Sequence, residues 1–171
     1  MSISVETTPA LAVRWVQWAA AASPRRNPIS DPDGRHAHRN QPGDVFFLAG
    51  TYGEDAVRSC TVPAGRPLFF PAFNIWHVGG APIAPMPDAY GRAFVDHISH
   101  PVVTADSGPA PFEVRGAWRN DVTGTRSSIP MRVWGIWATV PPLAPGPHQV
   151  HFEGGTGDGF RVTAHYELTV A

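Results

Sequence analysis

Residues 160–170 read FRVTAHYELTV, and apolar side chains alternate with more polar ones along the whole run. This period of two predicts a β-strand with one face in a core and the other in water. The run is preceded by HQVHF (148–152), and the glycine-rich stretch 153–159 joins the two. Glycine permits the backbone conformations that tight connections require, so the two runs predict an antiparallel hairpin.

Short apolar runs punctuated by Gly and Pro also occur upstream of this hairpin. They are DVFFLAGT (44–51), VRSCTV (57–62), RPLFFPAFNIW (66–76), PVVTAD (101–106), PFEVRGAW (111–118) and MRVWGIWATV (131–140). Many short runs at such spacing predict an all-β fold, an antiparallel, jelly-roll-like β-sandwich. The stretches VFFL and LFF are apolar on both faces and are therefore expected to be central strands.

Two helices are expected beside these strands. Residues 8–23 have helical apolar spacing, with Thr8 as N-cap and Pro9 at the first helical position. A short central helix is predicted from Asp88 to about Ser99, because small and aromatic side chains recur there at a spacing of four. The polar segment 24–43 is expected to be a surface loop. No repeat or long linker divides residues 1–171, which predicts a single domain.

Composition excludes several classes of function. The 171 residues carry a formal net charge of -1 without a basic run, so neither nucleic acid nor an anionic membrane is an expected partner. All 13 basic residues are arginine, which excludes Schiff-base and P-loop lysines. The acidic start and the lone Cys60 suggest a cytoplasmic protein without a secretory signal or disulfide. Oligomeric state is left open.

Spaced motifs occur near the two ends of the chain. They are QPGDVFFLAGTYG (41–53), VRSCTVPAGRPLFFPAFN (57–74) and PPLAPGPHQVHFEGG (141–155) followed by FRVTAHYELTV. These segments resemble a family of uncharacterised, mostly exported bacterial proteins with the blocks Q-x-G-x-V-x-F-L-A-G-T, R-x-C-x-V-P-x-G, F-F-P-x-x-N and P-L-x-P-G-x-H before Y-x-L-T-V. The resemblance covers roughly residues 27–78 and 139–171 and implies no established reaction.

This chain both keeps and loses features of that family. The resemblance implies that exported members carry a Cys where this chain has Ala37, and that it could pair with the Cys of R-x-C, which is Cys60 here. Loss of that partner is consistent with a reducing cytoplasm. The retained family residues, most of which have an adequate structural explanation, are Gln41, Gly43, Arg58, Pro63, Gly65, Pro71 and Asn74.

A candidate small-molecule site lies where a buried strand leads into the apolar loop GGAPIAPMP (79–87). The expected proton-transfer residues are His77, Asp96, His97 and His100. The expected ligand-binding residues are Asn74, Trp76, Met86, Tyr90, Phe94 and Arg58. The alternative is a purely structural role, in which these aromatic residues belong to the hydrophobic core and the histidines cap helices.

No cofactor is expected, because the chain lacks nucleotide-binding, nucleophile-elbow and paired-Cys motifs. His36 and His38 form a weak metal half-site, since no carboxylate follows at the required spacing. The leading hypothesis is a binding protein for an apolar small molecule, leaning towards a cofactor-independent isomerase, lyase or cyclase. The alternative is a non-catalytic module that binds carbohydrate or protein. An enclosed apolar cavity beside His77 and His97 would favour the first, and a flat, exposed aromatic strip would favour the second.

Overall fold

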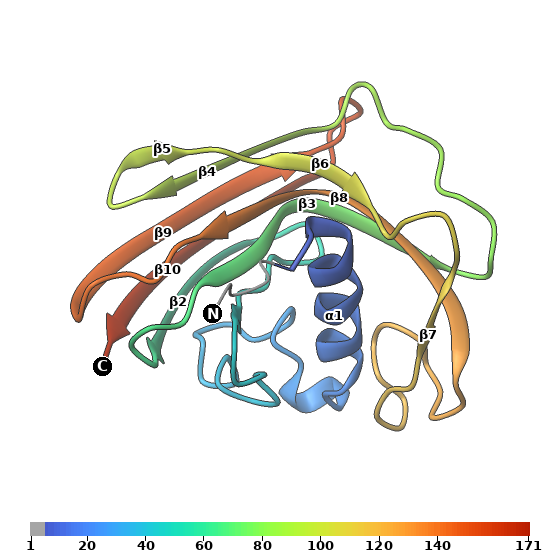
Figure 1. Ribbon diagram of the computed structural model, residues 1–171, viewed down its shortest axis with the longest axis horizontal. Coiled ribbons are helices and arrows are strands. Elements are labelled where there is room, and N and C mark those ends of the chain that lie inside the picture. Colours follow the sequence, from blue (N-terminus) through green and yellow to red (C-terminus); the bar gives the residue numbers. More distant parts are fainter. Residues whose placement is uncertain (1–5) are drawn as a thin grey trace.

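The computed structural model describes residues 6–171 and contains two five-stranded sheets and one α-helix (Figure 1). Residues 1–5 lie outside the described part, and they belong to the start of the chain on which the prediction of no secretory signal rests. The first sheet has the order β1-β3-β8-β6, with β7 also paired to β8. Its strands are β1 (Phe46–Phe47), β3 (Leu68–Val78), β6 (Val103–Asp106), β7 (Phe112–Val114) and β8 (Ile129–Val140).

The second sheet has the order β2-β10-β9-β4-β5. Its strands are β2 (Asp55–Val62), β4 (Tyr90–Val95), β5 (Ile98–His100), β9 (Gly146–Gly155) and β10 (Arg161–Val170). The β9–β10 hairpin confirms the alternation that predicted it, because Val162, Ala164, Tyr166, Leu168 and Val170 are all buried.

The β-rich fold is confirmed, but a purely antiparallel jelly-roll is wrong because both sheets are mixed. Strand β1 pairs in parallel with β3, and β2 pairs in parallel with β10. Between β1 and β3 the chain crosses to the second sheet, where it forms β2. When the chain returns to the first sheet as β3, it runs in the same direction as β1. The stretch VFFL is buried, yet it supplies only the two-residue edge strand β1, whereas LFF lies within the central strand β3.

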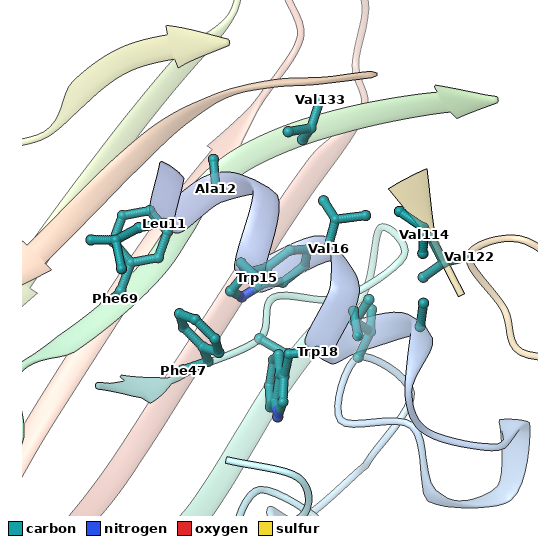
Figure 2. Packing of buried hydrophobic residues seen from close by; sticks show 14 of the residues in the cluster. Leu11, Ala12, Trp15, Val16, Trp18, Phe47, Phe69, Val114, Val122 and Val133 are labelled. Atoms are coloured by element: carbon teal, nitrogen blue, oxygen red, sulfur yellow. The ribbon is translucent and has the colours of Figure 1, made fainter. Parts of the chain in front are cut away.

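Apolar layers cover both faces of the first sheet. On one face it shares a core with the second sheet, where the rings of Phe70 and Phe152 stack with centroids 4.5 Å apart. On the other face it packs against the helix α1 (Thr8–Ala20), and Figure 2 shows Trp15 and Val16 of this helix in one cluster with Phe69 of β3 and Val133 of β8. The double coverage explains why β3 and β8 lack the simple alternation of a half-exposed strand.

The N-terminal helix is confirmed, with an end at Ala20 instead of residue 23. Thr7, and not Thr8, occupies the N-cap position, and its side chain makes no capping hydrogen bond. Tertiary contacts hold the helix: the indole N–H groups of Trp15 and Trp18 each donate, at 2.9 Å, to carbonyl oxygens outside the helix. Packing of one apolar face therefore compensates for the missing cap.

The expected central helix at 88–99 is wrong, because this segment forms the hairpin β4–β5. Asp96 and His97 make its two-residue connection with φ values of 49° and 67°. Positive φ at both central residues defines a type I′ turn, which matches the twist of paired strands. The spacing of four was misleading because strand pairing with β9, and not a helical face, places these side chains.

The segment 24–43 contains one short 3₁₀ turn, η1 (Pro24–Arg26), and is less exposed than expected for a surface loop. Asn27, Ile29 and Asp31 are each no more than 3% exposed. Figure 1 shows this segment beside α1, and the carbonyl oxygens of Ile29 and Asp31 accept hydrogen bonds from Arg58 on β2 of the second sheet. The segment therefore contributes several buried residues to the interior, while others, such as those of η1, remain exposed.

Cys60 is a free thiol on β2, as expected, but it is only half-buried. Val57, on the same strand, is 68% exposed. Burial still raises the pKa of the thiol to about 12, so Cys60 stays protonated at neutral pH. A protonated thiol is a poor nucleophile, which is consistent with a structural role.

Candidate functional site

A pocket of about 160 Å³ lies between α1, strand β3 and the ends of two loops. Its lining comes from five separate stretches of the chain. The lining residues are Trp15, Ile29, Gly50, Thr51, Tyr52, Pro71, Ala72, Phe73, Asn74, Trp76, Phe160 and Val162. Two of the residues that the sequence nominated for ligand binding, Asn74 and Trp76, are among them.

Aromatic rings form much of the pocket wall. The ring of Trp76 lies 6.3 Å from that of Trp15 and 6.5 Å from that of Tyr52, between centroids. Phe160, in the turn before β10, packs edge-on against Phe73 at 6.1 Å. Tyr52 and Phe160 are 41% and 42% exposed. The pocket therefore has buried aromatic surface inside and exposed aromatic surface at its edge.

The polar groups of the pocket differ in how well they are satisfied. Thr51 Oγ1 donates to the carbonyl oxygen of Glu54 at 2.6 Å and accepts backbone N–H groups, so it has no free capacity for a ligand. Burial raises the pKa of the Tyr52 phenol, which is therefore neutral. By contrast, Asn74 Nδ2 is buried and has no hydrogen-bond partner within residues 6–171.

Three polar residues of the N-terminal motifs, Gln41, Arg58 and Asn74, can be compared by their hydrogen-bond partners. The Gln41 amide bonds to the backbone of Ala37 and Phe47 at 2.7 to 2.8 Å. Arg58 is 2% exposed and donates from all three guanidinium nitrogens to protein oxygens. Both side chains stabilise loops, so Arg58 does not reach the pocket as a ligand-binding group. Only Asn74 has a buried polar atom that the described protein leaves unpaired.

The four predicted proton-transfer residues do not converge on this pocket. His77 lies at the exposed end of β3 with Nε2 2.7 Å from the carbonyl oxygen of Ala81. His100 Nε2 lies 2.9 Å from the carbonyl oxygen of Thr139. Asp96 and His97 form the type I′ turn of the second sheet. The structure thus brings Asp96 and His97 together and separates them from His77, which is on the first sheet.

The remaining ligand-binding candidates lie in other places. Met86 lies in the loop that follows β3 and packs against the small apolar cluster of Phe73, Trp134 and Ile136. Tyr90 begins β4 and is 36% exposed. Phe94 lines a separate groove on the outer face of the second sheet together with His97. The predicted site is therefore dispersed: Asn74 and Trp76 line the pocket, Phe94 and His97 line the groove, and the other predicted residues lie outside both.

The weak metal half-site at His36 and His38 does not adopt the extended conformation it requires. Residues 35–40 form turns, and Asn40 has a φ of 53°. His36 Nδ1 accepts a hydrogen bond from Arg39 Nε at 3.3 Å, whereas His38 is exposed. The two imidazoles thus differ in their surroundings and are not a preformed pair.

Trp15, Tyr52 and Phe160 line the pocket although the sequence did not indicate them as binding residues. They belong to the helix, to the loop after β1 and to the β9–β10 turn, and no local pattern connects these segments. Tyr52 and Phe160 each adjoin a glycine, Gly53 and Gly159, both with positive φ. Aromatic residues next to such turns were the available signal.

Comparisons with known proteins add little to this geometry. Neither a family model nor a curated protein matches the chain. A solved structure described as PbICP-C in complex with falcipain-2 aligns with a TM-score of 0.33 and 10% sequence identity. The alignment covers 75% of this chain and 100% of that one. Across residues 6–171, the helix present is too short to span a membrane.

Asp96 makes a surface ion pair with His148, and this pair gives a pH-dependent prediction. His148 Nδ1 lies 2.8 Å from Asp96 Oδ2, and this contact raises the pKa of His148 above its ordinary 6.5. The Gln149 N–H, and then His148, lowers the pKa of Asp96 below 3.8. The contribution of His148 to the free energy of unfolding is fully present below pH 6.5. It is lost as the pH rises through the pKa of His148 in the folded protein. Stability from Asp96 is lost only in acid.

We therefore expect His148→Gln to lower the free energy of unfolding more at pH 5.5 than at pH 9, by at most about 1 kcal/mol because the pair is at the surface. Urea unfolding of both proteins at the two pH values measures the difference. His36→Gln, which removes an imidazole without a carboxylate partner, serves as control. An equal loss at both pH values would show that the ion pair does not contribute.

Proposed function

We propose that this protein binds a small neutral molecule containing one ring in the pocket between α1 and β3. The volume of about 160 Å³ is close to the roughly 150 Å³ of a cavity that admits benzene in another protein. Trp15, Trp76 and Phe73 supply apolar and aromatic surface for such a ring. The observation that carries the proposal is the unpaired Asn74 amide in a pocket with aromatic walls.

The lining also restricts the charge of the ligand. None of the residues that line the pocket is Asp, Glu, Arg or His, so an ionised ligand would lose its hydration without a counter-charge. An unpaired buried amide costs free energy, and a ligand that pairs with it would remove that cost. A ring carrying a single hydroxyl or carbonyl group therefore fits better than a hydrocarbon or a carboxylate.

The proposal concerns binding and does not include the isomerase, lyase or cyclase chemistry considered from the sequence. Proton transfer needs an imidazole or carboxylate within hydrogen-bond reach of the ligand. Such groups are absent from the pocket lining as the structure describes it. The pocket is concave, and a concave pocket suits a small molecule. A carbohydrate- or protein-binding module would instead present a flat aromatic strip.

Phenol and toluene are suitable probes because they have nearly the same shape and differ in one hydroxyl group. That hydroxyl can donate or accept, so it can pair with either end of the Asn74 amide. Chemical-shift titrations of the folded protein should give dissociation constants for both. We expect Asn74→Leu to weaken the binding of phenol, relative to the binding of toluene, by about threefold to tenfold. This factor corresponds to the loss of one hydrogen bond.

Two tryptophan variants provide the matched control for this experiment. Trp76→Ala removes a pocket wall, whereas Trp118→Ala removes a side chain that is 59% exposed and stacks with Arg119. Binding of both probes should fall in the first variant and stay unchanged in the second. Shift changes confined to the separate groove of Phe94, His151 and His165, or no change with either probe, would contradict the proposed site.

A further inference from the structure

We propose that His151 and His165 form a two-histidine site for a divalent transition-metal ion, Cu²⁺ above all, on the outer face of the second sheet. This site is separate from the pocket and does not depend on the proposed function. The two residues lie on the neighbouring strands β9 and β10 and are directly opposite each other in the antiparallel register. Opposite residues project from the same face of a sheet, so both imidazoles are on one surface.

The separation of the two rings suits a shared ion. Their centroids are 5.7 Å apart, with an angle of 48° between the ring planes. A metal–nitrogen bond to imidazole is about 2.0–2.1 Å, and the ring centre lies roughly 1 Å beyond that nitrogen, so two imidazoles on one ion have centres on the order of 5–6 Å apart. The backbone register therefore supplies the spacing without a change in the fold.

Both imidazoles are available to an ion. Within residues 6–171 neither ring hydrogen-bonds to a protein group, whereas His77, His100 and His148 are engaged by carbonyl or carboxylate oxygens. The ring of Phe94 packs 5.9 Å from that of His151 and restricts its movement. An unengaged but restrained imidazole loses little freedom on coordination.

The surrounding groove leaves the remaining coordination positions to water. It has a volume of about 360 Å³ and is lined by Phe94, His97, Gln149, His151, Glu153 and His165. In the part of the chain that the structure describes, no set of three or more His, Cys, Asp or Glu side chains is arranged around one ion. Water therefore fills the other positions, and the open groove has room for it.

The donor set selects the ion. Imidazole suits Cu²⁺, Ni²⁺ and Zn²⁺, and affinity for a given nitrogen site is highest for Cu²⁺ in this series. Mg²⁺ and Ca²⁺ prefer oxygen ligands and are not expected to bind. Two ligands do not enclose the ion, so the site is expected to bind and release metal reversibly.

Titration of the folded, full-length protein with Cu²⁺ tests the proposal. Paramagnetic resonance of the loaded protein should show hyperfine coupling to two imidazole nitrogens. His151→Gln and His165→Gln should each weaken Cu²⁺ binding by about tenfold or more, the loss typical of a perturbed metal site. The double variant His36→Gln/His38→Gln should bind Cu²⁺ as the wild type does at this site.

The outcomes separate the proposal from incidental binding at other histidines. Unfolding midpoints measured without metal should be close to wild type for all variants, because both side chains are partly exposed. Should either single variant lose stability, His165→Asn and His151→Asn replace it. Unchanged Cu²⁺ affinity after loss of His151 or His165, or equal loss in the His36/His38 double variant, would overturn the assignment.

Discussion

Replacing Arg58 with methionine is expected to lower the free energy of unfolding by about 3–5 kcal/mol, because several buried oxygens would lose their donor at once. The guanidinium is buried on β2 and holds the segment 24–43 and the chain after β1 against it. Its acceptors are the carbonyl oxygens of Ile29, Asp31, Ala49 and Gly50 and the hydroxyl of Tyr166, at 2.6 to 3.0 Å. A thioether cannot donate to any of them.

Denaturant unfolding of Arg58→Met against Arg161→Met measures this contribution. Arg161 lies at the start of β10, its side chain is 59% exposed, and it is 3.6 Å from Asp55. Its loss should change stability by no more than about 0.5 kcal/mol. Tyr166→Phe, which removes only the hydroxyl that accepts from Arg58 Nη1 at 2.9 Å, should lie between the two. A loss below about 1 kcal/mol for Arg58→Met would contradict a structural role.

Trp15→Ala should cost about 3–5 kcal/mol, as expected for removal of a fully buried aromatic side chain. Trp15 is 1% exposed and lies at the centre of an indole cluster, with ring centroids 5.9 to 6.3 Å from Trp18, Trp76 and Trp137. The indole N–H also donates to the carbonyl oxygen of Leu48. The substitution removes apolar contacts and one buried hydrogen bond together.

The variant Trp15→Phe separates these two effects. Phenylalanine keeps much of the buried area but leaves the Leu48 carbonyl without its donor, at a cost of about 1–3 kcal/mol. Trp118→Ala, which removes an exposed indole, should stay within about 0.5 kcal/mol of wild type. Urea unfolding followed by far-ultraviolet dichroism measures all three. Equal stabilities of Trp15→Ala and Trp118→Ala would show that the helix does not stabilise the fold.

The sequence predicted those elements whose hydrophobic periodicity reflects one solvent-exposed face and one buried face. Strand β10 and helix α1 each have such a face, so their periods were visible. The segment 88–99 was misread because Ala93 is buried while residues on either side of it are partly exposed, a pattern shared by a short helix and a strand. The strand directions were hidden because parallel pairing is set by crossings between sheets, which leave no local signal.

The candidate site was only partly accessible from the sequence. Asn74 and Trp76 were nominated because they lie where a buried strand leads into an apolar loop rich in Gly and Pro, and both line the pocket. Histidines were nominated as proton carriers, yet backbone carbonyl oxygens engage His77 and His100. Whether a polar side chain is already paired depends on backbone groups far away in the chain, and this is the property that distinguishes Asn74 from Arg58.

The parallel pairing of β2 with β10 has a consequence for the order of assembly during synthesis. On the ribosome, β2 emerges more than 90 residues before its partner, since it spans Asp55–Val62 and β10 spans Arg161–Val170. Until β10 arrives, β2 has no neighbour in its sheet, and Arg58 lacks the Tyr166 hydroxyl. Such distant contacts slow folding and prolong the exposure of unpaired strand edges. Nascent chains of this protein therefore depend on late closure, and they are candidates for chaperone capture until β10 is complete.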